Sequence, residues 1–424
     1  MKTAKIGLSL IVALGSTALV ALPTTSARAQ APSLSHDVVM TDLRAPWDMA
    51  FLEDGTMFFT EKCHGLSVRM PSGDVMPLLG MTGTDGYSLT GDDLFCEGQG
   101  GMQGVALDPA FVENRTIYVY SSSRAGDAPS NRVLRMTVAE DFASVSDRVD
   151  IVTDIPYKPA ASNHPFGGPG AHNGGRIRFH DDGFLYVTTG DTHNGVGPQS
   201  PTLLSGKVLR IDTDGNAAPD NGAPDGFDPR IFTYGHRNVQ GIAFDPDTGA
   251  VVIAEHGPWH SDEVTVLRAG GNGGWDPRPN MAGRGDCPDD YCGYSPNQMD
   301  GMDPAERAAF MPMTDTATYP DAMPPAWVNN GLSQGTSSAA FLEGEQWGDW
   351  NGNLVVGVMG IGFGGTPVGQ RIDMLDIAED GLSAEVMTLP LTMPPGRFRS
   401  VVLGPDGNLY AAMDEGEIYR IIPN

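Results

Sequence analysis

The sequence predicts an all-β fold, a six-bladed β-propeller. One phrase recurs six times along the chain: an apolar β-patterned segment, a turn with Asp or Gly, and a second apolar segment. Each copy is followed by a further short β-patterned segment, whereas helix-periodic stretches are scarce. A unit of this kind hides only one face, so the units must stack and close into a ring.

The six phrases share alternating apolar residues around a turn, a pattern typical of two antiparallel strands. They cover residues 47–61, 104–122, 174–191, 240–256, 338–358 and 399–416. The third strands are expected at 66–70, 132–138, 207–215, 264–271, 371–381 and 418–422. Each unit leaves room for a fourth strand. Residues 30–424 therefore have a comfortable size for one six-bladed domain without a linker.

Two stretches interrupt this rhythm. Residues 154–171 are rich in Pro, Gly and His and lead into the third hairpin. Residues 276–331 form a long insertion, in which the one helical pattern runs from Asp303 to Phe310 with Pro304 suited to the first turn. Long insertions in a compact fold are usually functional lids or disordered segments. We expect this one to rim the mouth of the propeller.

The N-terminal segment 1–29 has the features of a secretory signal peptide. A basic start precedes an apolar run over residues 6–22, and the letters ARA at 27–29 give a small-x-small cleavage pattern. No later stretch is apolar for long enough to span a membrane. We therefore expect an exported protein, periplasmic or secreted, without stable membrane insertion.

The chain is strongly acidic, with 53 Asp and Glu residues against 26 Lys and Arg residues and a net charge of −27. Loss of the three basic residues of the signal segment would bring the charge to about −30. Nucleic acid is not expected as a partner, because a phosphate backbone is bound by a cationic surface. Only five lysines occur in the chain, so places where arginines cluster are informative.

The four cysteines are Cys63, Cys96, Cys287 and Cys292. Export favours disulfides, and four cysteines allow three pairings that sequence alone does not separate. We favour Cys287–Cys292, which closes a short loop, together with Cys63–Cys96. A zinc site would need tighter pairs and nearby histidines, and the haem-attachment pattern C-x-x-C-H is absent from the sequence.

The third hairpin carries the candidate catalytic pair. His172 opens the stretch AHNGGRIRFHDDGFLYVTTGD and Asp191 closes it, with the turn signal Asp182-Gly183 between them. A hairpin reverses direction, so its two ends return to the same edge of the sheet. A histidine held by a carboxylate is an oriented general base. A hydrogen-bonded surface pair is the alternative interpretation of the same spacing.

Two polar clusters precede the first strands of other units. In GQGGMQG (98–104), Gln99 lies in a glycine-rich loop that either lets the backbone approach a flat ligand or is a plain turn. In YGHRNVQG (234–241), Arg237 and Asn238 belong to a run of polar residues before a strand. Arginine can grip a carboxylate in bidentate fashion, so this cluster suits an anionic ligand.

Two further motifs suit a cation and an anion. In EHGPWHSDE (255–263), Gly257 and Pro258 lie in a turn that can expose carbonyl oxygens, which suit a hard cation such as calcium. In GRFRS (396–400), Arg397 and Arg399 alternate on a strand and point to the same side. Two such arginines in an acidic protein indicate a ligand with several negative charges.

These motifs carry a family resemblance. The run GHRNVQGIAFDP…EHGP…DEV…GGNGGW resembles the soluble sugar dehydrogenases that depend on pyrroloquinoline quinone (PQQ), the glucose/sorbosone dehydrogenase family. The resemblance extends from Trp47 to Arg420, and its specific parts are residues 172–191, residues 234–275 and the arginine pair.

The resemblance implies a six-bladed propeller that binds PQQ and calcium on its top face. It also implies oxidation of the anomeric hydroxyl of an aldose to a lactone, with electrons passed to an external acceptor. PQQ has three carboxylates, which three arginines would balance. The roles it implies are His172 as catalytic base and Asp191 as its orienting acid, quinone contacts from Gln99, Arg237, Asn238, Ser333, Arg397 and Arg399, and calcium binding by the carbonyls of Gly257 and Pro258.

The sequence departs from the family pattern in one place that matters for the cofactor. Relatives usually carry a basic residue after the fifth blade's strand, whereas VGVMGIGFGGTPVG (356–369) has no cation before Arg371. Two other functions therefore stay open. A calcium-dependent, lactonase-like hydrolase would need side-chain carboxylates around the metal, and a non-catalytic ligand-binding propeller would explain the missing cation.

Overall fold

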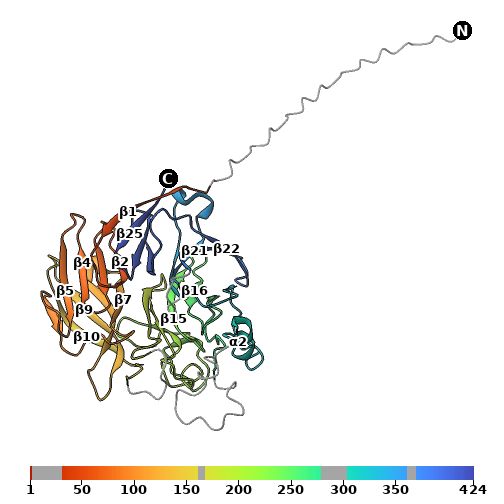
Figure 1. The fold of residues 1–424 in the computed structure, drawn as a ribbon, viewed down its shortest axis with the longest axis horizontal. Helices are drawn as coiled ribbons and strands as arrows, with labels where there is room; N and C mark the ends of the chain where they lie inside the picture. The colour runs from red at the N-terminus through yellow and green to blue at the C-terminus, as the bar shows by residue number, and fades with distance from the viewer. Residues whose placement is uncertain (2–30, 161–167, 278–302, 361–368) are drawn as a thin grey trace.

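The computed structural model describes residues 1, 31–160, 168–277, 303–360 and 369–424. Six β-sheets follow one another around a closed ring, in which the first strand of each sheet contacts the first strand of the next (Figure 1). This arrangement confirms the predicted six-bladed propeller. Each predicted hairpin forms the first two strands of one blade, and each predicted third segment forms the third strand.

In each of the first three blades, the first three strands overlap the predicted segments, and the strands after them lie outside those segments. Blade one contains β2 (Pro46–Phe51), β3 (Met57–Glu61), β4 (Gly65–Arg69), β5 (Val75–Met81) and the short parallel strand β6 (Leu89–Gly91). Blade two contains β7 (Met102–Leu107), β8 (Thr116–Ser123), β9 (Ser130–Val138) and β10 (Val145–Pro156). Blade three contains β11 (Gly174–Phe179), β12 (Leu185–Thr189), β13 (Lys207–Ile211) and β14 (Ile231–Tyr234).

The last three blades differ in where their fourth strand comes from. Blade four contains β15 (Val239–Phe244), β16 (Val251–Glu255), β17 (Glu263–Val266) and β18 (Trp327–Val328). Blade five contains β19 (Thr336–Phe341), β20 (Leu354–Met359), β21 (Gln370–Ile377) and β22 (Ala384–Thr388). Blade six contains β23 (Phe398–Leu403), β24 (Leu409–Met413), β25 (Ile418–Pro423) and the N-terminal strand β1 (Leu34–Met40).

The ring is closed by pairing the two ends of the chain. Strand β1 runs antiparallel to β25, with Leu34 opposite Pro423 and Val38 opposite Tyr419 (Figure 1). The sequence did not predict this strand, because its residues lie before the first repeated phrase.

The apolar core lies between neighbouring blades. One cluster joins Tyr118 and Tyr120 of blade two to Ile177 and Val187 of blade three, and all four side chains are buried. Similar clusters join the other blades, for example Val252 with Phe341 across blades four and five. The alternating apolar residues that predicted the strands are therefore the residues that are buried between neighbouring blades.

One charged cluster lies where the first strands of all six blades meet. Arg176 on β11 is 1% exposed and donates to the carbonyls of Trp47, Gln240, Ser337 and Arg399, which lie on four other blades. Its guanidinium also pairs with Asp48 at 2.5 Å. One side chain thus connects five of the six first strands.

Asp48 and Arg178 extend this cluster to the remaining blade. Arg178 donates two 2.7 Å hydrogen bonds to Asp48 and a third, of 3.2 Å, to the carbonyl of Val105 on blade two. Burial raises the pKa of the Asp48 carboxyl, but the charges of Arg176 and Arg178 outweigh burial and hold that pKa below its ordinary value. Burial lowers the pKa of Arg176 to about 10, so the guanidinium stays charged at neutral pH. The Asp48–Arg176–Arg178 cluster, which we call the axial cluster, is thus ionised and fully bonded.

The predicted insertion is partly described. Helix α2 (Pro304–Phe310) forms as predicted, with a capping box between Asp303 and Glu306. Its C-terminal neighbours Met311 and Met313 pack against Trp275. The last part of the expected insertion belongs to the propeller itself, since residues 327–328 form the fourth strand of blade four. Whether the insertion rims the mouth depends largely on residues 278–302, which lie outside the described residues.

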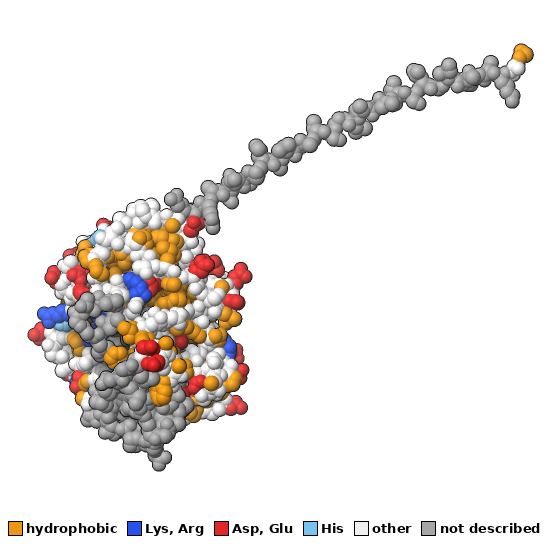
Figure 2. All heavy atoms as spheres, turned by 45° about the vertical axis from the view of Figure 1, so that its right-hand side comes forward, with side chains coloured by type: hydrophobic (Ala, Val, Ile, Leu, Met, Phe, Trp, Pro, Cys, Tyr) orange, Lys and Arg blue, Asp and Glu red, His pale blue; other side chains and the backbone are white. Residues whose placement is uncertain are grey.

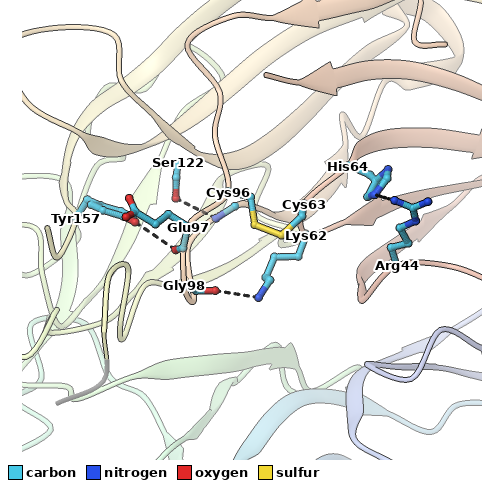
Figure 3. The surroundings of a disulfide bond; sticks show 10 residues. Arg44, Lys62, Cys63, His64, Cys96, Glu97, Gly98, Ser122 and Tyr157 are labelled. Carbon is cyan, nitrogen blue, oxygen red and sulfur yellow. Dashed lines mark hydrogen bonds between the residues drawn. A yellow bond between two sulfur atoms is a disulfide. The ribbon is translucent and has the colours of Figure 1, made fainter. Parts of the chain in front are cut away.

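The predicted disulfide Cys63–Cys96 is present, and it ties the β3–β4 turn of blade one to the loop that precedes β7 of blade two (Figure 3). Cys287 and Cys292 lie outside the described residues. We expect thiol titration of denatured, unreduced protein to find almost no free cysteine, and mass spectrometry of a digest to link Cys287 to Cys292. Finding two free thiols would contradict the second pairing.

The surface agrees with the acidic composition. On the face in Figure 2, acidic side chains are spread widely and basic ones are few. Within the described ranges, none of the helices has both the length and the apolarity that crossing a membrane would need.

Candidate active site

The candidate residues gather at the edge of the ring where first strands begin and second strands end, which we call the upper face. His172 lies two residues before β11, and Asp191 lies two residues after β12. Because β11 and β12 form a hairpin, these ends meet, and His172 Nδ1 lies 2.7 Å from Asp191 Oδ1. The structure thus brings together the two residues that the sequence paired, and both are buried.

Asp191 is held by three donors and is fully buried. The indole Nε1 of Trp275 donates to Oδ2 at 2.8 Å, and the backbone N–H of His193 donates to Oδ1 at 2.9 Å. Burial raises the pKa of Asp191 to about 7, although the charge of Arg237 acts in the opposite direction. The Trp275 contact spans 84 residues, and no sequence pattern indicated it.

The other ring nitrogen of His172 faces two further side chains. Nε2 lies 2.8 Å from Nε2 of His193 and 3.2 Å from Nη2 of Arg237. With the Nδ1 proton directed at Asp191, Nε2 carries the lone pair and accepts from these donors. His172, Thr192 and His193 all have positive φ, of 55°, 54° and 58°. Such backbone strain in non-glycine residues clusters at functional sites. Sequence reasoning missed His193, although it stands two residues after Asp191.

Arg237 and Asn238 reach the same place from blade four. Arg237 donates from Nη1 to the carbonyl of His256 at 2.6 Å, and its backbone N–H bonds the carboxylate of Glu255. The Nε of Arg237 is buried and has no hydrogen-bond partner among the described residues. Burial lowers the pKa of Arg237 to about 10, so it remains a cation. Asn238 accepts from the backbone of Gly174 at 3.1 Å and thereby joins blades three and four.

Arg397 and Arg399 point to the same side, as predicted, and share the carboxylate of Asp414. Arg397 Nε donates to it at 3.0 Å, and Arg399 donates from Nε and Nη2 at 2.8 Å each. Arg399 also donates to Gln240 of blade four at 3.2 Å. Burial raises the pKa of Asp414, but the two arginines more than offset this and hold that pKa below its ordinary value. We call Arg237, Arg397 and Arg399 the arginine cradle.

Gln99 approaches the candidate pair, His172 and Asp191, from blade two. Its side-chain Oε1 accepts from the backbone N–H of His172 at 3.4 Å, and the backbone N–H of Gln99 donates to the carbonyl of Pro169 at 3.0 Å. The glycines next to Gln99 lie close to other backbone segments of this chain. A Cβ on Gly98 would lie 2.3 Å from the Pro169 carbonyl oxygen, and one on Gly101 would lie 2.2 Å from that of Lys62. Close approach to a ligand stays a prediction.

Gly257, Pro258 and Ser333 belong to one loop arrangement around Asp262. Its carboxylate accepts from the backbone of Gly257 at 2.8 Å and from the hydroxyl of Ser333 at 2.5 Å. Ser333 is therefore brought next to the predicted metal turn, although its hydroxyl proton is directed at Asp262. In the part of the chain that the structure describes, no group of three or more His, Cys, Asp or Glu side chains is placed to hold a metal. A calcium ion at this turn would depend on backbone carbonyls.

The chain is similar to relatives of known name. The chain is 26% identical to aldose sugar dehydrogenase YliI of Escherichia coli K12, with 96% of each chain covered. It is 28% identical to quinoprotein glucose dehydrogenase B of Acinetobacter calcoaceticus, over 64% of this chain and 58% of the relative. Both relatives are named as sugar dehydrogenases.

Solved structures show the same fold. The soluble aldose sugar dehydrogenase of E. coli, in its apo form, matches with a TM-score of 0.71 at 23% identity, and the match covers 92% of this chain and 100% of that one. The profile of the glucose/sorbosone dehydrogenase family matches residues 43–420, nearly the whole propeller. The chain is a sugar oxidoreductase and belongs to the glucose/sorbosone dehydrogenase family.

Proposed function

We propose that this protein is an exported, PQQ-dependent aldose dehydrogenase that oxidises the anomeric hydroxyl of its sugar to a lactone and passes the electrons to an external acceptor. The observation that carries the proposal is the position of the His172–Asp191 pair beside Arg237, whose buried Nε has no partner among the described residues. A buried donor of this kind is costly unless a ligand accepts from it.

The donor set suits PQQ. The quinone carries three carboxylates, and the arginine cradle presents three guanidinium groups from blades four and six. Among the described residues, the carboxylate that pairs with these guanidinium groups is that of Asp414, which contacts Arg397 and Arg399. Arginine forks match carboxylates in bidentate geometry. Gln99 and Asn238 would add neutral contacts, and Ser333 would approach from blade five. When bound, PQQ supplies the acceptor for the hydride that leaves the sugar carbon.

His172 would take the proton. Its Nε2 accepts the proton of the anomeric hydroxyl, while Asp191 fixes the ring through Nδ1 and stabilises the imidazolium that forms. The sugar hydroxyl must take a place beside Nε2 that the side chains of His193 and Arg237 now share. The carbonyls of Gly257 and Pro258 would hold calcium, which acts as a Lewis acid toward an oxygen ligand.

Spectra test the proposal. Apo-protein mixed with PQQ and calcium should show a shifted quinone absorption, and aldose should then reduce an artificial dye acceptor. A calcium-dependent hydrolase would instead open a lactone without PQQ. A non-catalytic ligand-binding propeller would neither reduce the dye nor open a lactone. Absence of PQQ binding would overturn the dehydrogenase proposal.

The arginine cradle gives a prediction on affinity. Arg399→Ala removes a cation and also leaves Asp414 less well paired, so PQQ affinity should fall by roughly one to three decades, at about 1.4 kcal/mol per decade. A chelator should mimic part of the loss if calcium contributes. Titration of PQQ into wild type and Arg399→Ala, with calcium or with chelator, measures both effects. Equal affinity in the variant would remove Arg399 from the proposed site.

The pKa of Asp191, about 7, predicts how activity depends on pH. The ionised carboxylate is the form that stabilises the imidazolium, so kcat/KM should rise with pH through about 7. Asp191→Asn should lower kcat/KM and lose this dependence. A rise near pH 7 that persists unchanged in the variant would assign the ionisation to another group.

Asp191 also affects stability. In the folded protein the pKa of Asp191 lies above its ordinary value of 3.8, so folding favours the protonated form of this carboxyl. The contribution of Asp191 to the free energy of unfolding therefore falls as pH rises from about 4 to 7. Asp191→Asn should therefore be at least as stable as wild type at pH 8, as a urea unfolding curve would show.

A further inference from the structure

The inference concerns Lys62, a residue to which neither the sequence motifs nor the family resemblance assigned a role. No Lys or Arg follows the second strand of blade five to join the arginine cradle, because residues 356–369 contain neither. Lys62 follows β3 of blade one and is half-buried at the upper face. Its ammonium donates to the carbonyl of Gly98 at 3.0 Å, next to Gln99 (Figure 3).

A repeated backbone contact places Lys62 in the ring of residues that lines the upper face. At five blades, a residue within one position of the end of the second strand donates its backbone N–H to a backbone carbonyl just before the first strand. These bonds measure 3.0 or 3.1 Å and join Lys62 to Ala45, Ser122 to Gly101, His256 to Asn238, Met359 to Gly335, and Asp414 to Arg397. Lys62 is the one Lys or Arg among the five donors.

Three other members of this ring touch the arginine cradle. The carbonyl of His256 accepts from Arg237 at 2.6 Å, and that of Met359 accepts from Arg397 at 3.2 Å. Asp414 pairs with both blade-six arginines. Lys62 thus occupies the position in blade one that is equivalent to the positions from which residues of three other blades contact the arginine cradle.

The electrostatics agree with this placement. Burial, followed by repulsion from Arg399, lowers the pKa of Lys62, while Asp414 acts in the opposite direction and Arg397 adds to the repulsion. The ammonium therefore lies within the field of the blade-six arginines, and an anionic ligand between them would relieve the repulsion.

The Cys63–Cys96 disulfide fixes both ends of this contact. Cys63 directly follows Lys62, and Cys96 stands two residues before Gly98, the acceptor of the ammonium. Figure 3 shows Lys62 directed at Gly98, whereas Arg44 and His64 contact each other on the other side of the disulfide. The loop that carries Gln99 toward His172 is held by the same crosslink.

We propose that Lys62 is the fourth cation of the cofactor site, positioned by the Cys63–Cys96 disulfide, and that it stands in for the basic residue missing after blade five. This inference rests on the proposed function, since its ligand is the carboxylate-bearing quinone. Cofactor affinity then depends on the redox state of one disulfide, although neither cysteine touches the ligand.

The test is a titration of PQQ, in the presence of calcium, followed by quinone absorption and tryptophan fluorescence rather than by turnover. Lys62→Met keeps the aliphatic stem and should weaken PQQ binding about ten- to hundredfold, because a ligand carboxylate loses its partner. Lys62→Arg should restore most of the affinity. Arg44→Gln, which removes the same charge from an exposed residue beside the disulfide, should change affinity by less than about twofold.

Salt dependence separates an ionic contact from a structural role. Added salt screens ion pairs, so wild-type affinity should fall more steeply with ionic strength than that of Lys62→Met. The Cys63→Ser/Cys96→Ser variant should keep its circular dichroism spectrum and bind PQQ several-fold more weakly than wild type. If this double variant binds PQQ as tightly as wild type does, the disulfide does not position Lys62.

Two outcomes overturn the proposal in distinguishable ways. If wild type binds PQQ and Lys62→Met binds equally well, Lys62 is not part of the site and the dehydrogenase proposal stands. If wild type does not bind PQQ at all, both fail together. Circular dichroism of each variant confirms that any loss of binding is not a loss of fold.

Discussion

His172→Asn should lower the turnover of sugar with an artificial dye acceptor by about 10²–10⁴-fold, because general base catalysis typically contributes this much. PQQ binding should survive, since the variant keeps all three arginines of the cradle and removes only the contact of Arg237 with His172 Nε2. Steady-state kinetics together with a PQQ titration separate the two effects. Asp191→Asn should cost less, because it disturbs the orientation and charge of the base without removing it.

His180→Asn is the matched control. His180 lies at the opposite end of the same hairpin, where its Nε2 contacts the carbonyl of Gly249 at 3.1 Å. Its replacement should leave turnover within about twofold of wild type, because His180 lies at the end of the hairpin away from His172 and Asp191. Unchanged turnover in His172→Asn would remove that residue from the mechanism.

Arg176→Met should destabilise the fold by about 3–5 kcal/mol, the range expected when a buried ion pair loses one partner. The substitution removes hydrogen bonds to four blades and leaves Asp48 with Arg178 as its remaining charged partner. The effect should appear as a lower urea midpoint with little change in the slope of the unfolding curve.

Arg420→Met provides the comparison for a surface ion pair. Arg420 pairs with Asp37 at 2.6 Å, but its side chain is 36% exposed. Exposed pairs of this kind contribute about 0–1 kcal/mol. If both variants unfold at the same urea concentration, the axial cluster is not the stabilising connection that its contacts indicate.

The parts of the fold that the sequence predicted are those set by local turns. The Asp182-Gly183 turn aligns β11 with β12, and this alignment brings His172 to Asp191. The same logic placed Arg397 and Arg399 on one side, because strand alternation is a local property. Local patterns therefore accounted for six blades and for the contact between His172 and Asp191.

The contacts that the sequence did not predict are those made by closing the ring. Trp275 reaches Asp191 from blade four, and Arg176 binds residues as far away as Ser400. The spacing of these residues in the sequence predicts neither contact. Each contact depends on which blades become neighbours when the ring closes. Lys62 was missed for a related reason: a single lysine after a strand is uninformative until the closed ring brings it within the electrostatic influence of Arg399. His193 had a local signal, its position two residues after Asp191.

The pairing of β1 with β25 has a consequence for how the chain folds. Leu34 and Pro423 are partners in the same ladder, so the blade that closes the ring cannot be completed until the last residues of the chain are available. Contacts of such large sequence separation carry a high loop-closure entropy and slow folding. Until that ladder forms, blades one and six both present open flanks, and the chain is most exposed to aggregation and proteolysis. Completion of the ring, rather than formation of any one blade, is then the step that commits the chain to its native state.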